Sequence, residues 1–402
     1  MQNQSIDITL QPAGEDHIPA MAALWAEAFP EKPVERRDRE LREGLVFGDL
    51  SDCWIVEHEG RIAGALRTYR LTTHLWGRTL PTMGLAGVAV APDFRRRGIG
   101  RRMCVEALKM ARERGDVLSA LYPFRTSFYR DLGYVLGGEF HRYRFQPAEL
   151  GMYPGWDRVE RAPETGGAEA QGIYARVSER SNGLLVRTER MWSFLNREGT
   201  YLYLHRNPRG VATGYIAVRG RGGPPERSRL RVLELVSEDR EAYLGLLGWL
   251  SVQRDQWGRI TYDALPGERF YRRLAHPRTA SSAMTRGLWF HSAAVLRGPM
   301  FRVVNVEKIL DGGDESVDPP MGRPDDWQGP MQVRDTVLPE NQGQWATGAR
   351  VDSALSSTRN GVLSIGEVTT LLLDGRLPGQ APPPEGWTPN LGLPAVRLLD
   401  EF

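Results

Sequence analysis

The alternation of apolar and polar positions divides the chain into three blocks. Up to about residue 150 the sequence alternates helical and strand-like patterns, and the stretch 172–285 repeats much of that order. Residues 161–171 between them are polar and glycine-bearing, which predicts a linker or long loop. Short apolar runs between breaker-rich stretches begin near residue 286. We therefore expect three domains, because 402 residues exceed one ordinary core: 1–150, 151–285 and 286–402.

The first two blocks share an order of elements. In the first, residues 18–29 (IPAMAALWAEAF) and the stretch ERRDRELREGL have helical periodicity, CWIVEHEGRIAGALRTYRL predicts a hairpin turning at Glu59-Gly60, and MGLAGVAVAP predicts another strand. The second shows a helical segment RTERMWSFLNRE, strands TYLYLHR, GVATGYIAVRG and LRVLELV, a helix EAYLGLLGWLSVQRDQ and a strand RITYDALP. The shared hairpin, third strand, helix and further strand indicate a weak internal repeat.

The stretch VAVAPDFRRRGIGRRM, residues 88–103, carries the most specific chemistry. A short strand ends at its proline, and an amphipathic helix is expected from about Gly100 onward. Gly98 and Gly100 let another molecule approach the backbone amides closely. A glycine-bearing turn at a helix N-terminus presents unpaired N–H groups, so Arg95-x-x-Gly98-x-Gly100 predicts a pyrophosphate site. The dinucleotide-binding fingerprint and the Walker pattern are both absent from the sequence.

These residues resemble the acetyl-CoA-binding motif of the GNAT N-acetyltransferase superfamily, whose signature is Gln/Arg-x-x-Gly-x-Gly/Ala after a strand. VLSALYPF predicts the next strand, and TSFYRDLGYV resembles the superfamily's Phe-Tyr-x-x-x-Gly-Tyr/Phe segment. The resemblance implies an α/β fold, a mixed sheet flanked by helices, with acetyl-CoA as acetyl donor. The coenzyme-binding residues that it implies are Val88, Ala89, Val90, Arg96, Arg97, Gly98, Ile99, Gly100, Arg101, Phe124 and Arg125.

Acetyl transfer needs an acid to protonate the leaving thiolate and a neutral amine to attack. Tyr129 matches the position of the acid in many GNAT proteins, and a phenol with an ordinary pKa of about 10 can donate. Tyr134 is expected to be structural and Cys104 to lie in the core. Many family members place a glutamate on the strand before the turn, but MGLAGVAVAP has neither acid nor histidine. The base comes from elsewhere, or the amine binds already neutral. The histidines show no ligand spacing, so no metal is expected.

The length, the block order, LSIGEVTTLLLDG and the ending LLDEF are similar to the Eis (enhanced intracellular survival) family of GNAT proteins. That resemblance implies tandem GNAT folds followed by a sterol-carrier-protein-like domain of α+β class, and a homohexamer. It also implies that the terminal carboxylate of Phe402 is the base. The ordinary pKa of a chain-end carboxyl is about 3.3–3.7, so burial would have to raise it or a water would relay the proton. The second block lacks Arg-x-x-Gly-x-Gly, so we expect no coenzyme there.

The amine acceptor is less defined by the sequence. Members of the family acetylate polyamines such as aminoglycosides, and some accept lysine side chains. The resemblance places acceptor contacts on the first two helices and the strand before the turn, where Trp25, Phe29 and Met83 are candidates. Apolar and aromatic residues on such elements are more often core residues, so a packing role stays open for each.

Composition limits the alternatives. Lys and Arg total 52 and Asp and Glu 50, a balance that argues against a nucleic-acid-binding regulator built on the arginines at 95–102. A coenzyme- or lipid-binding carrier or scaffold with a vestigial GNAT core remains the other alternative. The start MQNQSIDITLQPAG has no basic region before an apolar one, and no run of about 18 apolar residues occurs, so we expect no signal peptide and no membrane contact. Two widely spaced cysteines suit a reducing interior, and a cytoplasmic protein is expected.

Overall fold

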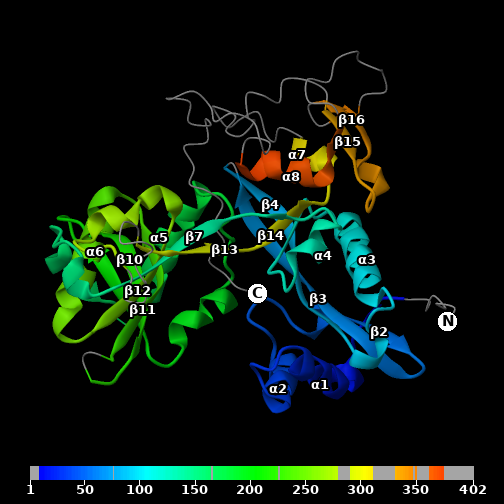
Figure 1. The fold of residues 1–402 in the computed structure, drawn as a ribbon, viewed down its shortest axis with the longest axis horizontal. Coiled ribbons are helices and arrows are strands. Elements are labelled where there is room, and N and C mark those ends of the chain that lie inside the picture. The colour runs from blue at the N-terminus through cyan, green and yellow to red at the C-terminus, as the bar shows by residue number, and fades with distance from the viewer. Residues whose placement is uncertain are drawn as a thin grey trace. The chain divides into compact units, whose positions relative to one another are not determined.

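The computed structural model separates the chain into two compact units (Figure 1). The residues that it describes are 9–75, 77–163, 166–224, 227–278, 290–310, 331–346, 349–350 and 362–374. Of these, the first unit holds the described residues up to Gly137 and those from Pro299 onward, and the second holds those between. The first unit is therefore built from two separate stretches of chain.

A mixed sheet of seven strands forms the centre of the first unit. In sheet order its strands are β1 (Gln11–Pro12), β2 (Cys53–His58), β3 (Arg61–Leu75), β4 (Arg78–Val90), β5 (Leu118–Leu121), β14 (Met300–Val303) and β6 (Val135–Leu136). β4 pairs antiparallel with β3 and parallel with β5. β14, from the later stretch of chain, pairs antiparallel with both β5 and β6. The later stretch thus completes the sheet that the earlier one begins.

Helices cover both faces of this sheet. They are α1 (Ile18–Ala28), α2 (Val34–Glu43), α3 (Ile99–Arg114) and α4 (Thr126–Arg130). A Cβ on Gly64 of β3 would meet Met103 of α3, whereas Arg67 of the same strand stacks on Trp25 of α1, 3.9 Å from the ring centre. Because side chains alternate across a strand, α1 and α3 pack on opposite faces. The predicted helices and strands of this part of the chain are confirmed, and Gly115, with φ +92°, ends α3.

From residue 306 onward, the described part of the C-terminal block also packs in the first unit. It comprises α7 (Val306–Leu310), α8 (Ile365–Asp374) and four strands, β15 (Met331–Arg334), β16 (Gly343–Ala346), β17 (Ala349–Arg350) and β18 (Val362–Ser364). These strands form a separate small sheet in the order β17-β16-β15-β18. The likeness of this block to a sterol carrier protein stays a prediction.

The second unit repeats the pattern of the first around another sheet of seven strands. In sheet order these are β13 (Ala294–Arg297), β7 (Glu139–Phe145), β12 (Arg259–Ala264), β11 (Arg229–Ser237), β10 (Ala212–Arg221), β9 (Thr200–Arg206) and β8 (Val159–Arg161). Its helices are α5 (Gly166–Glu179), the 3-10 helix η6 (Glu189–Asn196) and α6 (Arg240–Ser251). The order β9-β10-β11-α6-β12 matches β2-β3-β4-α3-β5, so the internal repeat is confirmed.

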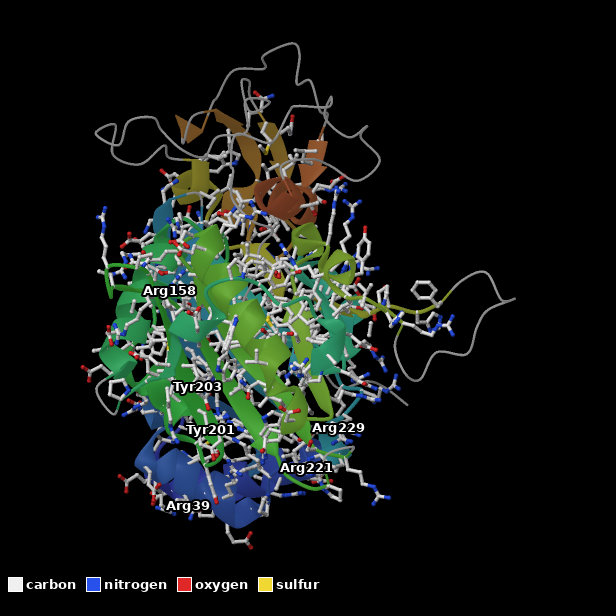
Figure 2. All side chains as sticks on the ribbon, turned by 90° about the vertical axis from the view of Figure 1, so that its left-hand side faces the viewer. Arg39, Arg158, Tyr201, Tyr203, Arg221 and Arg229 are labelled. Atoms are coloured by element: carbon white, nitrogen blue, oxygen red, sulfur yellow. The ribbon has the colours of Figure 1, made fainter. Side chains whose placement is uncertain are left out.

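Helices cover both faces of the second sheet as well. Tyr201 and Tyr203, labelled in Figure 2, are two residues apart on β9 and so share one face. Tyr203 packs on Trp249 of α6, with 4.2 Å between ring centroids. Leu204, which points to the other face, belongs to a buried cluster with Ile173 of α5. The second unit therefore has the helix–sheet–helix layering of the first.

Some expectations about the second block differ from the structure. The stretch 161–171 was expected to be a loop, but α5 begins at Gly166 within it. This helix is stabilised by burial of Ala170, Ile173 and Tyr174 rather than by local helix propensity, which its glycines lower. RTERMWSFLNRE contains the 3-10 helix η6 rather than an α-helix.

The two sheets also cross the expected domain boundaries. β7 precedes residue 150, yet it pairs with β12 and β13 in the second sheet. β14 follows residue 285, yet it lies in the first sheet. β13 also follows residue 285, yet it lies in the second sheet. The first sheet therefore takes one strand, and the second sheet two, from blocks of sequence assigned to other domains.

Candidate active site

β4 bulges just before its end. Between Ala65 and Arg67 of the paired strand β3, β4 contributes one extra residue. Gly87 in this bulge has φ +58°, a conformation that favours glycine, and its carbonyl accepts a hydrogen bond of 2.5 Å from the indole N–H of Trp25. The bulge therefore fixes the direction in which the predicted binding residues 88–90 leave the sheet.

β4 and β5 separate along the same stretch. They pair from Thr82 to Gly84 only, after which β5 ends at Leu121 while β4 continues to Val90. In this register the edge of β4 beyond Gly84 has no partner in β5. Backbone N–H and C=O groups on such an edge can pair with an extended ligand, as an added strand would. The predicted residues Val88, Ala89 and Val90 lie on this edge.

The turn from β4 into α3 presents backbone N–H groups. Arg96 and Gly98 both have left-handed φ values, +65° and +78°, and Gly98 caps α3 without a side chain. The first backbone hydrogen bond of α3 runs from the Arg102 N–H to the Gly98 carbonyl. The N–H groups of residues 99–101 come before it and so have no partner within the helix. Within the described chain, the N–H groups of 96–98 also meet no backbone acceptor. The N–H groups of residues 96–101 are thus available to an anion at the positive end of the helix dipole.

The turn, the end of β4 and α4 meet at one place. A Cβ on Gly100 would lie 3.5 Å from Val90 Cγ2 and 3.8 Å from Phe128 Cζ. Arg101 Nη1 donates to the carbonyl of Asp131, just after α4, at 3.3 Å. The structure therefore brings the anion-binding turn and the open edge of β4 next to the helix that carries Tyr129.

Tyr129 has the properties of a proton donor. Its ring makes edge contacts with Phe128 and Tyr134, and only 3% of the residue is exposed. Burial raises the pKa of Tyr129, so the phenol stays protonated at neutral pH. No described residue forms a hydrogen bond with its hydroxyl, whereas the Tyr134 hydroxyl bonds to Ser119 at 2.6 Å. Among the described residues, the Tyr129 hydroxyl thus has no hydrogen-bond partner, whereas the Tyr134 hydroxyl has one.

Phe124 and Arg125 lie after β5 on the same side of the first unit as α4. Phe124 is 63% exposed, and its ring contacts Phe128 and Tyr129 at 5.5 Å. Arg125 is exposed too. A large exposed aromatic ring beside an anion-binding turn is a suitable surface for a bulky ligand.

The acceptor candidates and the base are less well placed. Trp25 and Met83 are fully buried in the core of the first unit, and Phe29 is partly buried against that core. Phe402, the predicted base, lies outside the described residues. Cys104 is buried, and burial raises its pKa to about 12, which excludes a reactive thiolate. The core role expected for Cys104 is confirmed.

In the described ranges, three or more His, Cys, Asp or Glu side chains nowhere gather as metal ligands would. None of the helices in the same ranges is long and apolar enough to cross a membrane.

Family comparisons identify the fold around this site. Residues 9–137 and 183–297 each match a family described as an acetyltransferase (GNAT) domain. The N-acetyltransferase Eis of Mycobacterium tuberculosis is 27% identical over 260 residues, 58% of this chain and 62% of that relative. The chain belongs to the Eis family of GNAT acetyltransferases. It spans less than two thirds of the length of the Eis proteins that it matches. An uncharacterized N-acetyltransferase of Streptomyces griseus is 29% identical over 161 residues, 36% of this chain and 37% of the relative.

Solved structures share the fold of this chain. A GCN5-related N-acetyltransferase from Kribbella flavida superposes with a TM-score of 0.71 at 22% identity, covering 100% of both chains. One from Anabaena variabilis gives 0.73 at 20% identity, covering 91% of this chain and 89% of that one. Eis1 from Mycobacterium abscessus gives 0.66 at 18% identity, covering 92% and 90%. At these identities the likeness concerns the fold alone.

The second GNAT domain differs from the first at the helix that would bind the coenzyme. α6 corresponds to α3, but its N-cap is Asp239, whose carboxylate accepts a hydrogen bond of 2.8 Å from the Ala242 N–H. A carboxylate at this position fills the end of the helix and repels a phosphate. In the first domain the same position is Gly98. Among the described residues, the N-terminus of α6 is thus capped by a carboxylate, whereas that of α3 is open.

Sequence reasoning missed two features of the site. The first is the bond between Trp25 and Gly87, which links α1 to the bulge of β4 and has no sequence signal beyond the glycine. The second is Arg302 of β14, which is fully buried beneath α4. An arginine inside the apolar run PMFRVVNV was the available signal, because a charge at such a position requires a buried partner.

Proposed function

We propose that this chain is an acetyl-CoA-dependent N-acetyltransferase that acts on amines. The observation that carries the proposal is the row of free N–H groups at 96–101, next to the open edge of β4. GNAT acetyltransferases use acetyl-CoA as co-substrate. The glycine cap at Gly98 fits this ligand, since a Cβ there would meet no atom within 4 Å and the loop is open to an approaching anion.

Each part of the site takes one part of the coenzyme in this proposal. The N–H groups of 96–101 hold the pyrophosphate, because hydrogen bonds to a charged oxygen are stronger than neutral ones. Residues 88–90 pair with the pantetheine amides and orient the thioester, and Phe124 and Arg125 line the other side. Acetyl-CoA, when bound, supplies the acetyl thioester.

The proposed reaction is direct attack of the amine within a ternary complex. The amine nitrogen bonds to the acetyl carbon as the carbon–sulfur bond breaks, and Tyr129 donates its phenolic proton to the leaving sulfur. Because burial raises the pKa of Tyr129, the phenol carries its proton at neutral pH. We propose the terminal carboxylate of Phe402 as the base that takes the proton from the amine, directly or through water.

The finer features of the function remain part of the proposal. The acceptor is a polyamine, aminoglycoside-like or a lysine side chain, held near Trp25, Phe29 and Met83. We also propose that the C-terminal block, residues 286–402, contains a sterol-carrier-like domain. A cytoplasmic homohexamer completes the proposal, and the two free, buried cysteines suit a reducing compartment.

The test is thiol release from acetyl-CoA with a panel of polyamines that includes aminoglycosides. The full chain is compared with Tyr129→Phe, with a chain lacking Phe402, and with Tyr134→Phe as a matched loss of a buried hydroxyl. We expect the first two variants to lose most of kcat while still binding coenzyme, and Tyr134→Phe to keep it.

The outcomes separate the parts of this proposal. Full activity without Phe402 would move the base to the acceptor pocket. Coenzyme binding without turnover of any amine would favour a carrier or scaffold. Binding to nucleic acid that survives a saturating level of coenzyme would favour the regulator.

A further inference from the structure

Arg302 on β14 carries a charge in the interior of the first unit. Its side chain is 0% exposed and that of its partner Asp335 is 1% exposed. Nη2 of Arg302 donates to both carboxylate oxygens of Asp335, at 2.9 and 2.6 Å. Nη1 donates to the backbone carbonyl of Leu132. A buried ion pair of this kind is seldom more stabilising than apolar side chains of equal volume, so its role must be sought in the geometry that it fixes.

The Leu132 carbonyl belongs to the turn that ends α4. The Leu132 N–H donates to the Tyr129 carbonyl at 2.9 Å, and the Tyr134 N–H donates to the same oxygen at 3.1 Å. Gly133 between them has φ +87°, and a Cβ there would lie 2.9 Å from Arg302 Nη1. The guanidinium therefore packs directly against the backbone that follows Tyr129.

Asp335 anchors this contact to the rest of the first unit. Its carboxylate also accepts the N–H groups of Val337 and Leu338, at 2.9 and 3.0 Å, and the side-chain amide of Asn341 at 2.9 Å. The side-chain oxygen Oδ1 of Asn341 accepts a hydrogen bond of 2.7 Å from Arg112 Nη1. Because Arg112 is on α3, the network joins the turn after Tyr129 to the helix that carries the anion-binding turn.

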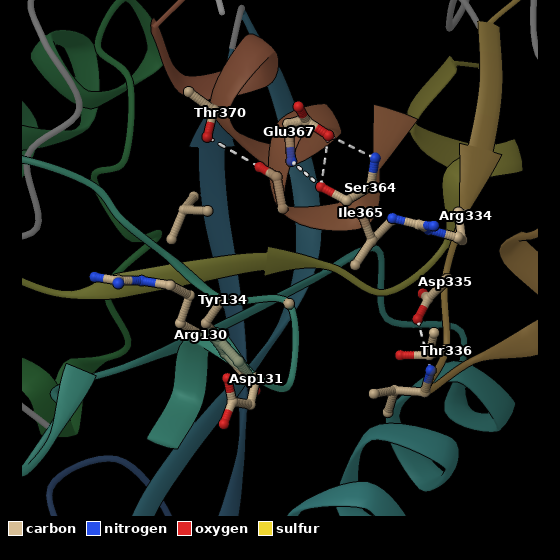
Figure 3. Close-up of a pocket in the computed structure, with 14 residues that line it drawn as sticks. Arg130, Asp131, Tyr134, Arg334, Asp335, Thr336, Ser364, Ile365, Glu367 and Thr370 are labelled. Carbon is tan, nitrogen blue, oxygen red and sulfur yellow. Dashed lines mark hydrogen bonds between the residues drawn. The ribbon is translucent and has the colours of Figure 1, made fainter. Parts of the chain in front are cut away.

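One side of that turn borders a cavity. A cavity of about 430 Å³ borders Asp131, Gly133 and Tyr134, with Arg334 and Thr336 on its far side (Figure 3). Side chains that face a cavity lack the contacts that would hold them in a dense core. On the side of the turn that packs in the core, the bond from Arg302 acts together with the burial of Leu132 and Tyr134 to hold its position.

We propose that Arg302 is a positioning residue for the proton donor, and that it fixes the Tyr129 phenol through the Leu132 carbonyl. This inference rests on the proposed function, in which Tyr129 is the acid. In this proposal, β14 and Asp335 contribute to acetyl transfer. Both come from the chain after the second unit, and their contribution is separate from any role of the chain end. Arg302 itself touches neither substrate.

A double-mutant cycle tests the inference: wild type, Arg302→Lys, Tyr129→Phe and the double variant. Lysine keeps the charge but cannot bridge Leu132 and Asp335 with a planar fork. We expect Arg302→Lys to lower kcat about 10- to 100-fold while the KM for acetyl-CoA and the Kd for CoA change less than about threefold. In the Tyr129→Phe background the same change should lower kcat less than about threefold, because the group that it positions is gone.

The matched control is Arg187→Lys. Arg187 forms an ion pair of similar burial with Glu234 in the second unit, with side chains 2% and 4% exposed and 2.9 Å between Nη2 and Oε2. We expect it to lower the unfolding midpoint as Arg302→Lys does, without lowering kcat. Asp335→Asn is the second variant if Arg302→Lys does not fold.

The outcomes distinguish failure of the inference from failure of the proposed function. If Tyr129→Phe keeps full activity, the assignment of the acid is wrong and the inference falls with it. If Tyr129→Phe loses activity but Arg302→Lys keeps its kcat, only the positioning role is overturned. The same holds if the fold-loss of kcat in the double variant equals the product of the losses in the two single variants. If neither Arg302→Lys nor Asp335→Asn folds, the pair is structural and the proposal is likewise overturned.

Discussion

Replacement of Gly98 by alanine tests the anion-binding turn through stability and binding at once. Gly98 has φ +78° and ψ 0°, a left-handed conformation that costs an L-residue about 1–2 kcal/mol. No atom lies within 4 Å of the added Cβ, so no clash adds to that cost. For a domain of this size, a loss of about 1 kcal/mol lowers the unfolding midpoint by about 2–4 °C.

The effect on coenzyme binding should be larger than the effect on stability. The added methyl group points into the open space that the proposed pyrophosphate enters. If it prevents one charge-assisted hydrogen bond, worth about 1.5–3 kcal/mol, the Kd for CoA rises about 10- to 150-fold. The kcat at saturating acetyl-CoA should change little, because Tyr129 is not moved.

Gly100→Ala is the matched control. Its Cβ would make ordinary contacts, 3.5 Å to Val90 and 3.8 Å to Phe128, and Gly100 lies in helix α3 without a positive φ. Alanine in a helix is favoured over glycine by about 0.5–1 kcal/mol, so the unfolding midpoint should rise. Titration calorimetry with CoA and thermal unfolding give both quantities for both variants. Gly98→Ala with wild-type affinity for CoA would refute the pyrophosphate assignment.

Three further predictions concern other parts of the chain. Asp239→Ala should lower the free energy of unfolding by about 1 kcal/mol in thermal melts, because it removes the cap on the Ala242 N–H, and should leave acetyl transfer unchanged. Burial raises the pKa of Cys53 to about 11 and that of Cys104 to about 12, so neither thiol should react with a thiol reagent at pH 8 until denaturant is added. Burial raises the pKa of Tyr129 in the folded state, so the unfolded chain loses this proton first as the pH rises. The free energy of unfolding should therefore fall as the pH rises above about 10, the ordinary pKa of tyrosine, and denaturant titrations measure this.

The catalytic half of the first unit was predictable because its signals are local. Its signals are contiguous in sequence: the strand that ends at Pro92, the two glycines and the apolar face of α3. Each of these patterns predicts one local structure. The bulge of β4 was not predictable, because it depends on the pairing with β3 and on Trp25 of α1. α5 was missed because its glycines lower the local helix propensity, and the helix is stabilised instead by burial of its side chains in the second unit.

The strands that cross between blocks are the clearest limit of sequence reasoning. β7 and β14 are short, and nothing in either sequence states which sheet it joins. A strand's partners are set by which open edge it reaches, which is a property of the whole fold. Arg302 illustrates the consequence, because its role depends on β14 lying between β5 and β6, far from its own sequence neighbours.

The proposed function depends on coenzyme binding by the turn at residues 96–101 of the first GNAT domain. Titration calorimetry of the full chain with CoA, beside Gly98→Asp, tests it most directly, since this variant places a carboxylate where the second domain has Asp239. We predict one CoA per chain for the wild type and loss of binding in Gly98→Asp. Two sites per chain, no binding by the wild type, or unchanged binding by Gly98→Asp would contradict the account.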